Sequence, residues 1–139
     1  YAASRAQHVE ELIAPALERG SIVVCDRFIA SSVAYQSFGR GLDRSLVEKV
    51  NEMAMGSCIP DMTIFLRISV EEALRRRVRR AEQIDRLEEA GQRLQERVAL
   101  GYEAIFKEDS NAVAVDAHQD PDDIAQEINK DLLKRWAWL

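Results

Sequence analysis

Two adjacent polar side chains, Asp26 and Arg27, follow directly after a short apolar run at residues 21–25. The run reads Ser-Ile-Val-Val-Cys, which is typical of a strand buried on both faces of a parallel sheet. Ligands of such sheets bind at the carboxyl ends of the strands. An arginine there can hold a phosphate through two hydrogen bonds, and an aspartate can orient Mg²⁺ or its bound water. The alternative is an ordinary loop in which the two side chains form a salt bridge.

A second group of polar side chains lies a few residues further on. Residues 31–36 read Ser-Ser-Val-Ala-Tyr-Gln, and residues 39–41 read Gly-Arg-Gly. Hydroxyl groups, an aromatic ring and an amide within six residues could contact a nucleobase and its sugar. The same residues could equally form a helix cap with exposed side chains, and the stretch alone does not separate the two interpretations.

An arginine-rich segment is the third candidate. Residues 75–80 read Arg-Arg-Arg-Val-Arg-Arg, and residues 85–88 read Asp-Arg-Leu-Glu. The functional interpretation is an arginine-bearing lid over a polyphosphate. One alternative is a solvated helix face held by salt bridges, which is the usual role of a charge run. Another is a patch that binds RNA or a membrane, but the acidic residues just downstream and the net charge of -5 disfavour it.

Three apolar runs and several amphipathic segments must position these residues. Strands are predicted over residues 21–25, 62–68 and 112–115, and Cys25 is expected to be a small buried side chain. Apolar strands that alternate with helices indicate an α/β fold with a parallel sheet. The segments predicted to be helical are residues 2–19 with a kink or restart at Pro15, a turn or two in 30–37, a helix between Asp43 and Gly56, one from the Ser69–Glu72 capping box into the arginines, one from Leu87, and one from Asp120-Pro121.

Composition narrows the class of protein. The chain has 139 residues, 47% of them hydrophobic and 31% charged, which suits one globular domain. The negative net charge argues against a nucleic-acid-binding protein. No apolar run approaches the ~20 residues that span a membrane, and we find no signal peptide or lipidation motif, so we expect a cytoplasmic protein. The two cysteines do not have metal-ligand spacing.

Seven short motifs follow one another along the chain: Tyr1-x-x-x-Arg5, Asp26-Arg27-Phe28, Ser31-x-x-x-Tyr35-Gln36, Gly39-Arg40-Gly41, Pro60-Asp61-Met62-Thr63, Asp85-Arg86-Leu87-Glu88 and Val115-Asp116-Ala117. This ordered set resembles the thymidylate kinase family over nearly the whole chain. The resemblance implies a three-layer fold like that of P-loop NTPases, transfer of the γ-phosphoryl group from Mg-ATP to dTMP, and a homodimer packed through helices that could include residues 2–19.

The resemblance also implies roles for residues around the nucleoside. Tyr1 corresponds to an aromatic ring that stacks on thymine, and Arg5 to an arginine that hydrogen-bonds the base. Positions four apart share a helix face, so both can reach one base. Ser31 and Gln36 would help to fix the base. Tyr35 would pack under the sugar and disfavour a 2′-hydroxyl group.

A second set of implied roles concerns phosphoryl transfer. Arg27 would hold the acceptor phosphate, and Asp26 would lie close to the transferred group and, indirectly, to the metal. In a lid at about residues 79–88, Arg86 would close on the transferring phosphoryl group and Arg79 would pack on adenine. Charge neutralisation by such a lid arginine can contribute ~10³–10⁵ in rate.

The chain departs from the family in its first part. It begins at Tyr1, inside a predicted helix, and holds no Gly-x-x-x-x-Gly-Lys-Ser/Thr phosphate loop. We therefore expect a partial domain over residues 1–139 that lacks the first βαβ unit and its central strand, with a gap between 22–25 and 62–68. The fragment alone is expected to be inactive. Alternatives are a non-catalytic nucleotide-binding or dimerisation remnant, or a kinase for another nucleoside monophosphate.

Overall fold

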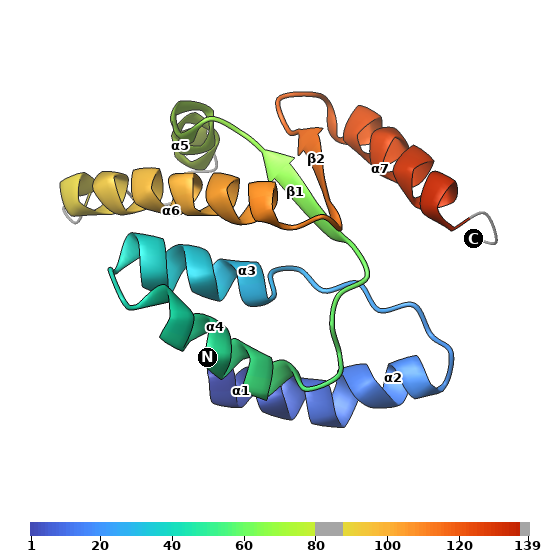
Figure 1. The fold of residues 1–139 in the computed structure, drawn as a ribbon. Coiled ribbons are helices and arrows are strands. Elements are labelled where there is room, and N and C mark those ends of the chain that lie inside the picture. The colour runs from blue at the N-terminus through green and yellow to red at the C-terminus, as the bar shows by residue number, and fades with distance from the viewer. Residues whose placement is uncertain (80–87, 137–139) are drawn as a thin grey trace.

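The chain folds into two groups of helices around a small parallel sheet (Figure 1). The computed structural model describes residues 1–79 and 88–136, with side chains for 1–76 and 91–136. The α-helices and π-helical turns (η) and the strands are, in chain order, α1 (Ala2–His8), η1 (Val9–Ile13), α2 (Ala14–Glu18), α3 (Ile29–Ser32), η2 (Val33–Gly39), α4 (Arg44–Met55), β1 (Thr63–Arg67), α5 (Val70–Arg79), α6 (Glu88–Glu108), β2 (Ala112–Asp116) and α7 (Pro121–Arg135).

The sheet consists of β1 and β2, which run parallel with Ile64 opposite Val113 and Leu66 opposite Val115. Val115 is 1% exposed, so the β2 end of the sheet reaches the core. In Figure 1, α7 lies beside β2, while α5 and α6 lie on the other side of the strands. The strands predicted at 62–68 and 112–115 are confirmed, and so is the α/β class with a parallel sheet.

The strand predicted at residues 21–25 is wrong for this structure. The segment runs as an unpaired loop between α2 and α3 (Figure 1). A strand needs the backbone groups of a neighbour, and within the described residues β1 and β2 pair only with each other. Without a covering neighbour, Val24 is 92% exposed and Cys25 is exposed rather than buried. The unpaired segment fits the expected gap in the sheet.

The helix predicted over residues 2–19 is present as α1, η1 and α2, which follow one another without a gap, so a widened turn stands where an interruption was predicted at Pro15. Pro15 has no N–H group to donate to the carbonyl four residues before it. Just before it the helix widens by one residue, where the Ala14 N–H donates to the Val9 carbonyl. Gly20, at φ 76°, ends the helix, and its N–H donates to the Leu17 carbonyl at 2.9 Å.

Helix α4 begins at the predicted cap, where the Asp43 carboxylate accepts from the Leu46 N–H at 2.9 Å. One face is buried and includes Asn51, Ala54 and Met55. The opposite face leaves three large apolar side chains in water: Leu46 is 59% exposed, Val50 40% and Met53 80%.

Helix α6 packs closely on α3 and η2 because two glycines allow it. A Cβ atom at Gly101 would lie 2.8 Å from the Phe38 side chain, and one at Gly39 would lie 2.9 Å from Leu94 Cδ1. Val98, at 3% exposed, lies in the same contact. This packing brings the middle of α6 next to the polar stretch at residues 31–36.

The last helix, α7, begins with Asp120 accepting from the Asp122 N–H at 3.1 Å, with Pro121 in its first turn as predicted.

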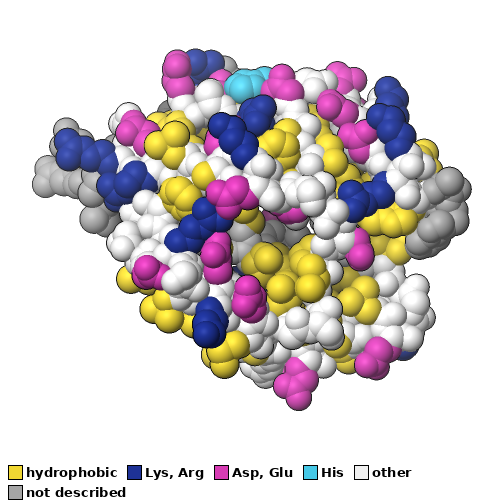
Figure 2. All heavy atoms as spheres, viewed as in Figure 1, with side chains coloured by type: hydrophobic (Ala, Val, Ile, Leu, Met, Phe, Trp, Pro, Cys, Tyr) yellow, Lys and Arg dark blue, Asp and Glu magenta, His cyan; other side chains and the backbone are white. Residues whose placement is uncertain are grey.

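Figure 2 shows hydrophobic side chains gathered around a hollow near the middle of the face seen in Figure 1. Within the described part of the chain, no helix has a long enough apolar stretch to cross a membrane.

Candidate functional site

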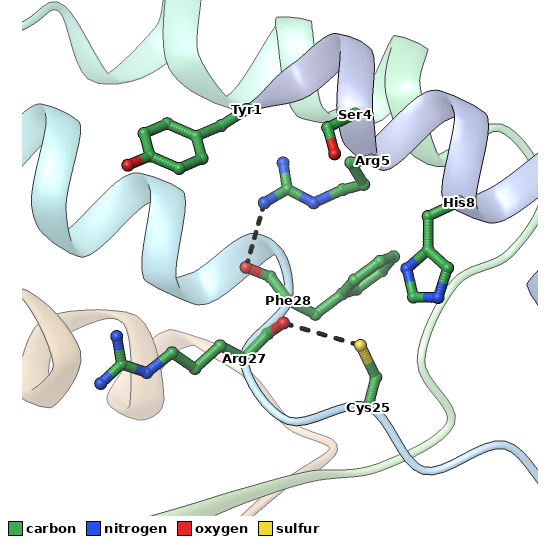
Figure 3. A pocket seen from close by; sticks show the side chains of 7 residues that line it. All are labelled: Tyr1, Ser4, Arg5, His8, Cys25, Arg27 and Phe28. Atoms are coloured by element: carbon green, nitrogen blue, oxygen red, sulfur yellow. Dashed lines mark hydrogen bonds between the residues drawn. The ribbon is translucent and has the colours of Figure 1, made fainter.

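A cavity of about 220 Å³ lies where the loop at 25–28 meets α1 (Figure 3). It brings together three residues singled out in the sequence: Tyr1, Arg5 and Arg27. The loop and the helix are at least 17 residues apart in sequence, so only the fold joins them. The lining residues are Tyr1, Ser4, Arg5, His8, Cys25, Arg27 and Phe28.

Arg5 is held on the inner side of this cavity. Its Nη2 donates to Ser32 Oγ at 2.8 Å and to the Phe28 carbonyl at 3.4 Å, and its Nη1 donates to Asn51 Oδ1. The guanidinium carbon lies 5.5 Å from the centroid of the Phe28 ring. Burial lowers the pKa of Arg5 below its usual range, with the nearby Cys25 thiol acting in the opposite direction. Arg5 is therefore a positioned donor rather than a freely moving surface charge.

Tyr1 lies one helical turn before Arg5 and is 88% exposed. Its carbonyl accepts from the Arg5 N–H at 2.9 Å, so both residues belong to the same turn. Figure 3 shows the ring and the guanidinium on the same side of α1. An exposed ring beside a fixed donor can stack on a planar group while the donor bonds to its edge.

Arg27 adopts a backbone conformation that is rare for a side chain of its size. Its φ is 63°, and it is the one described non-glycine residue with a positive φ. Such a conformation costs about 1–2 kcal/mol and is found preferentially at functional sites. The guanidinium carbon lies 6.0 Å from the centroid of the Tyr35 ring on η2. The turn thus aims Arg27 at the polar stretch that follows it.

Ser31 is joined to α6 by a hydrogen bond. Its Oγ lies 2.7 Å from the Tyr102 hydroxyl oxygen. Burial raises the pKa of Tyr102, while the bond to Ser31 acts against that change. Tyr35, Arg27 and Asp26 also act on the phenol through their charges, which places Tyr102 beside the candidate site.

The remaining predicted site residues are less closely placed. Asp26 is exposed, Gln36 is half-buried in η2, and neither lines the described cavity. The α5 backbone ends at Arg79, whose side chain is not described, and Arg86 lies outside the described residues.

Earlier in the arginine cluster, Arg75 and Arg76 pair with Glu71 and Glu72 along α5. That part matches the alternative of a salt-bridged helix face.

Asp26 is compatible with an indirect metal role but does not form a metal centre by itself. Within the described residues, no three His, Cys, Asp or Glu side chains gather as ligands. Mg²⁺ in nucleotide sites is commonly held by one or two carboxylates, with phosphates and waters supplying the rest. One exposed carboxylate beside Arg27 fits that pattern.

Several site residues were missed in the sequence. Ser32 and Asn51 hold Arg5, and Tyr102 bonds to Ser31. Asn51 left a signal: it lies four residues after Val47 and three before Ala54, so a polar amide falls on the inward face of an amphipathic helix. His8 also lines the cavity.

Comparison with known proteins supports the resemblance. The family model described as thymidylate kinase matches residues 1–128. The chain is 44% identical to the thymidylate kinase of Trichodesmium erythraeum (strain IMS101) over 97% of its length. It is also 44% identical to that of Parasynechococcus marenigrum (strain WH8102) over 97%, and 45% identical to that of Synechococcus sp. (strain CC9605) over 99%.

The match covers only part of each relative. The chain spans 60%, 63% and 64% of the lengths of these three proteins. The family match nonetheless extends through both strands and over all the helices up to α7. It also includes every residue that lines the cavity. This chain therefore belongs to the thymidylate kinase family.

Proposed function

We propose that this chain forms the dTMP-binding part of an enzyme that transfers the γ-phosphoryl group of ATP to dTMP, giving dTDP. The observation that carries the proposal is the single cavity lined by Tyr1, Arg5 and Arg27. It combines an exposed aromatic ring, a fixed donor and a second arginine. Those are the groups needed for a base, its polar edge and a phosphate.

The base would be held by Tyr1 and Arg5. The pyrimidine ring stacks on Tyr1, and the guanidinium, which only donates hydrogen bonds, faces a carbonyl oxygen of thymine. Ser31 and Gln36 assist in fixing the base, and Tyr35 packs under the sugar. The half-buried setting of Arg5 favours this bond, because a hydrogen bond shielded from water is stronger than an exposed one.

The acceptor phosphate would be held by Arg27. A guanidinium can bind two phosphate oxygens at once, and the left-handed turn directs it toward the Tyr35 side of the site. Asp26, the preceding residue, would lie close to the transferred group and help to hold the metal indirectly. Mg²⁺, when bound with ATP, supplies charge neutralisation at the phosphates.

The ATP side of the reaction needs residues other than those of the cavity. The 139 residues contain no Gly-x-x-x-x-Gly-Lys-Ser/Thr sequence, so nothing in them matches the usual cradle for the β- and γ-phosphates. Arg79 and Arg86 are proposed as lid residues for adenine and the transferring phosphoryl group. We propose that the 139 residues alone do not transfer phosphate, and that the complete kinase is a cytoplasmic homodimer.

Two assays test this proposal. dTDP formation from ATP and dTMP is measured for the 139-residue chain and for the complete protein that contains it. We expect turnover only from the complete protein. Turnover above background by the 139-residue chain would refute its proposed inactivity. A complete protein that binds dTMP in calorimetry but never forms dTDP would refute the kinase function and favour a non-catalytic nucleotide-binding protein.

Base preference is tested in the same assays. dTMP is compared with other nucleoside monophosphates at equal concentration. A higher kcat/KM for another base than for thymine would show a kinase of different specificity.

A further inference from the structure

Asn51 is the most deeply buried polar side chain near the cavity. It is 5% exposed and lies on the inward face of α4, between the apolar neighbours of that face. Its Oδ1 accepts from Arg5 Nη1, although 46 residues separate the two in sequence. Asn51 itself does not line the cavity. Any effect it has on a ligand there must pass through Arg5.

The orientation of the Asn51 amide follows from its partner. A guanidinium has donors only, so Oδ1 must face Arg5 and the Nδ2 group must point away. That Nδ2 is buried and has no hydrogen-bond partner within the described residues. A buried donor without a partner destabilises the folded state, so such a group calls for an explanation other than stability.

The contacts of Arg5 supply that explanation. Asn51 engages Nη1, while Ser32 and the Phe28 carbonyl engage Nη2. Acceptors on both terminal nitrogens fix the plane of the guanidinium, whereas acceptors on Nη2 alone would leave the group free to turn about that nitrogen. Of the two side-chain acceptors, Ser32 belongs to the helix that follows the Arg27 turn, and Asn51 is the only contribution from α4.

We propose that Asn51 is a positioning residue for base recognition, which sets the orientation of Arg5 toward the carbonyl edge of thymine. The inference rests on the proposed function, because it needs dTMP in the cavity. Asn51 does not touch the substrate, so its effect is on binding of the base. The competing explanation is purely structural: Asn51 fastens α4 to α1 and has no specific effect on dTMP.

A double-mutant cycle in the complete kinase separates the two. Asn51→Leu removes the acceptor at similar volume, and Arg5→Ala removes the group on which it acts. We expect Asn51→Leu to raise the KM for dTMP about tenfold to a hundredfold with little change in kcat. In the Arg5→Ala background the same change should have no further effect on KM. An equal increase in both backgrounds would overturn the proposal.

A conservative variant guards against loss of folding. Asn51→Asp keeps an acceptor facing Arg5 and removes the unpartnered donor, so we expect a KM for dTMP within about threefold of wild type and a melting temperature that is no lower. A large rise in KM for this variant would overturn the proposal. Asn129→Leu, an exposed asparagine on α7, serves as the matched control and should leave KM unchanged.

The same data distinguish this proposal from the proposed function. If Arg5→Ala itself leaves the KM for dTMP unchanged, then the role of Arg5 in base binding fails, whatever Asn51 does. If Arg5→Ala raises the KM and Asn51→Leu does not, only the positioning role of Asn51 fails.

Discussion

Arg27 combines an unfavourable backbone conformation with a side chain that we propose holds the acceptor phosphate. At φ 63° a Cβ atom crowds the neighbouring carbonyl, and glycine would adopt this conformation without strain. The sequence keeps arginine there, beside the Tyr35 ring. We propose that binding of the acceptor phosphate, rather than stability, explains why an arginine stands at this strained position.

Substitutions at Arg27 should therefore separate activity from stability. In the complete kinase, Arg27→Ala should lower kcat/KM for dTMP about 10²–10³-fold, because a charge-assisted contact at the reacting group is lost. Arg27→Gly should be equally inactive but about 1 kcal/mol more stable than Arg27→Ala, because glycine adopts the turn freely. Steady-state kinetics and thermal melting measure both quantities.

Either half of this expectation can fail independently. Near-normal kcat/KM in Arg27→Ala would remove Arg27 from the acceptor site. A glycine variant that melts no higher than the alanine variant would mean that position 27 does not adopt the left-handed conformation.

For individual residues, the sequence predicted members of the candidate site where they belong to a recognisable motif. Tyr1, Arg5 and Arg27 were predicted and meet in one cavity. Ser32 and Asn51 were not predicted, because a serine or asparagine within a helix carries no sign of its distant partner. The two hydrogen bonds of Arg5 span 27 positions, to Ser32, and 46 positions, to Asn51. Such long-range bonds depend on how the helices pack, which a single sequence does not specify.

Helix α6 and the α3–η2 segment are linked by the Ser31–Tyr102 bond as well as by packing. The raised pKa of Tyr102 makes this link sensitive to alkali. The neutral phenol is the form that the folded state prefers. Its stabilisation is complete below the unfolded-state pKa of about 10 and decreases as pH rises through the higher folded-state value.

Tyr102→Phe provides the test at the element scale. At about pH 8 the variant should be roughly 1 kcal/mol less stable than wild type, because the hydrogen bond to Ser31 is lost. Above about pH 10 the difference in stability between the two proteins should shrink. In the wild type the unfolded chain can release the Tyr102 proton while the folded state holds it, which lowers wild-type stability, whereas phenylalanine has no proton to release. Urea unfolding of both proteins across this range measures the difference. A gap that stays constant or widens with pH would contradict the assignment.

Helix boundaries were predicted well because their signals are local. The cap at Asp43, the end of the helix predicted over residues 2–19 and the Asp120-Pro121 start all lie within a residue of where the sequence placed them. The strand at 21–25 was wrong because pairing is a property of two segments. Its β-branched residues favour an extended chain, but they cannot supply the neighbour that a strand requires.

The molecule as a whole leaves an apolar stripe on the outer face of α4. Leu46, Val50 and Met53 recur at spacings of four and three, and they are 59%, 40% and 80% exposed. Leu12, on the adjoining helix run, is 57% exposed. Exposed apolar side chains that gather on one face of a helix can form an association site, and we propose the α4 stripe as the homodimer contact.

A charge placed in this stripe should disrupt the dimer. We expect the complete kinase to be dimeric and Met53→Glu to be monomeric in size-exclusion chromatography with light scattering, because a carboxylate would be buried without a partner. Leu100→Glu, on α6 and 67% exposed in the wild type, is the control that should stay dimeric. A monomeric wild type, or a Met53→Glu variant that remains dimeric, would contradict this interface.

At the scale of the whole molecule, the sequence predicted the fold class but not which apolar side chains would be exposed on the surface. Alternation of apolar strands with helices predicted the parallel sheet. The exposure of Leu46, Val50 and Met53 was not predicted. The hydrophobic pattern of a helix is the same whether its apolar face packs in a core or against another molecule.

The close contact between Gly101 and Phe38 has a consequence for how the two positions can change over time. A Cβ atom at 101 would lie 2.8 Å from the Phe38 side chain, so even alanine would collide with that ring. A methyl group at 101 becomes acceptable once a smaller residue stands at 38, and the first change is harmful without the second. A side chain larger than glycine at position 101 is therefore tolerated only after a smaller residue has replaced Phe38, so we expect substitutions at these two positions, 63 residues apart in sequence, to arise in that order.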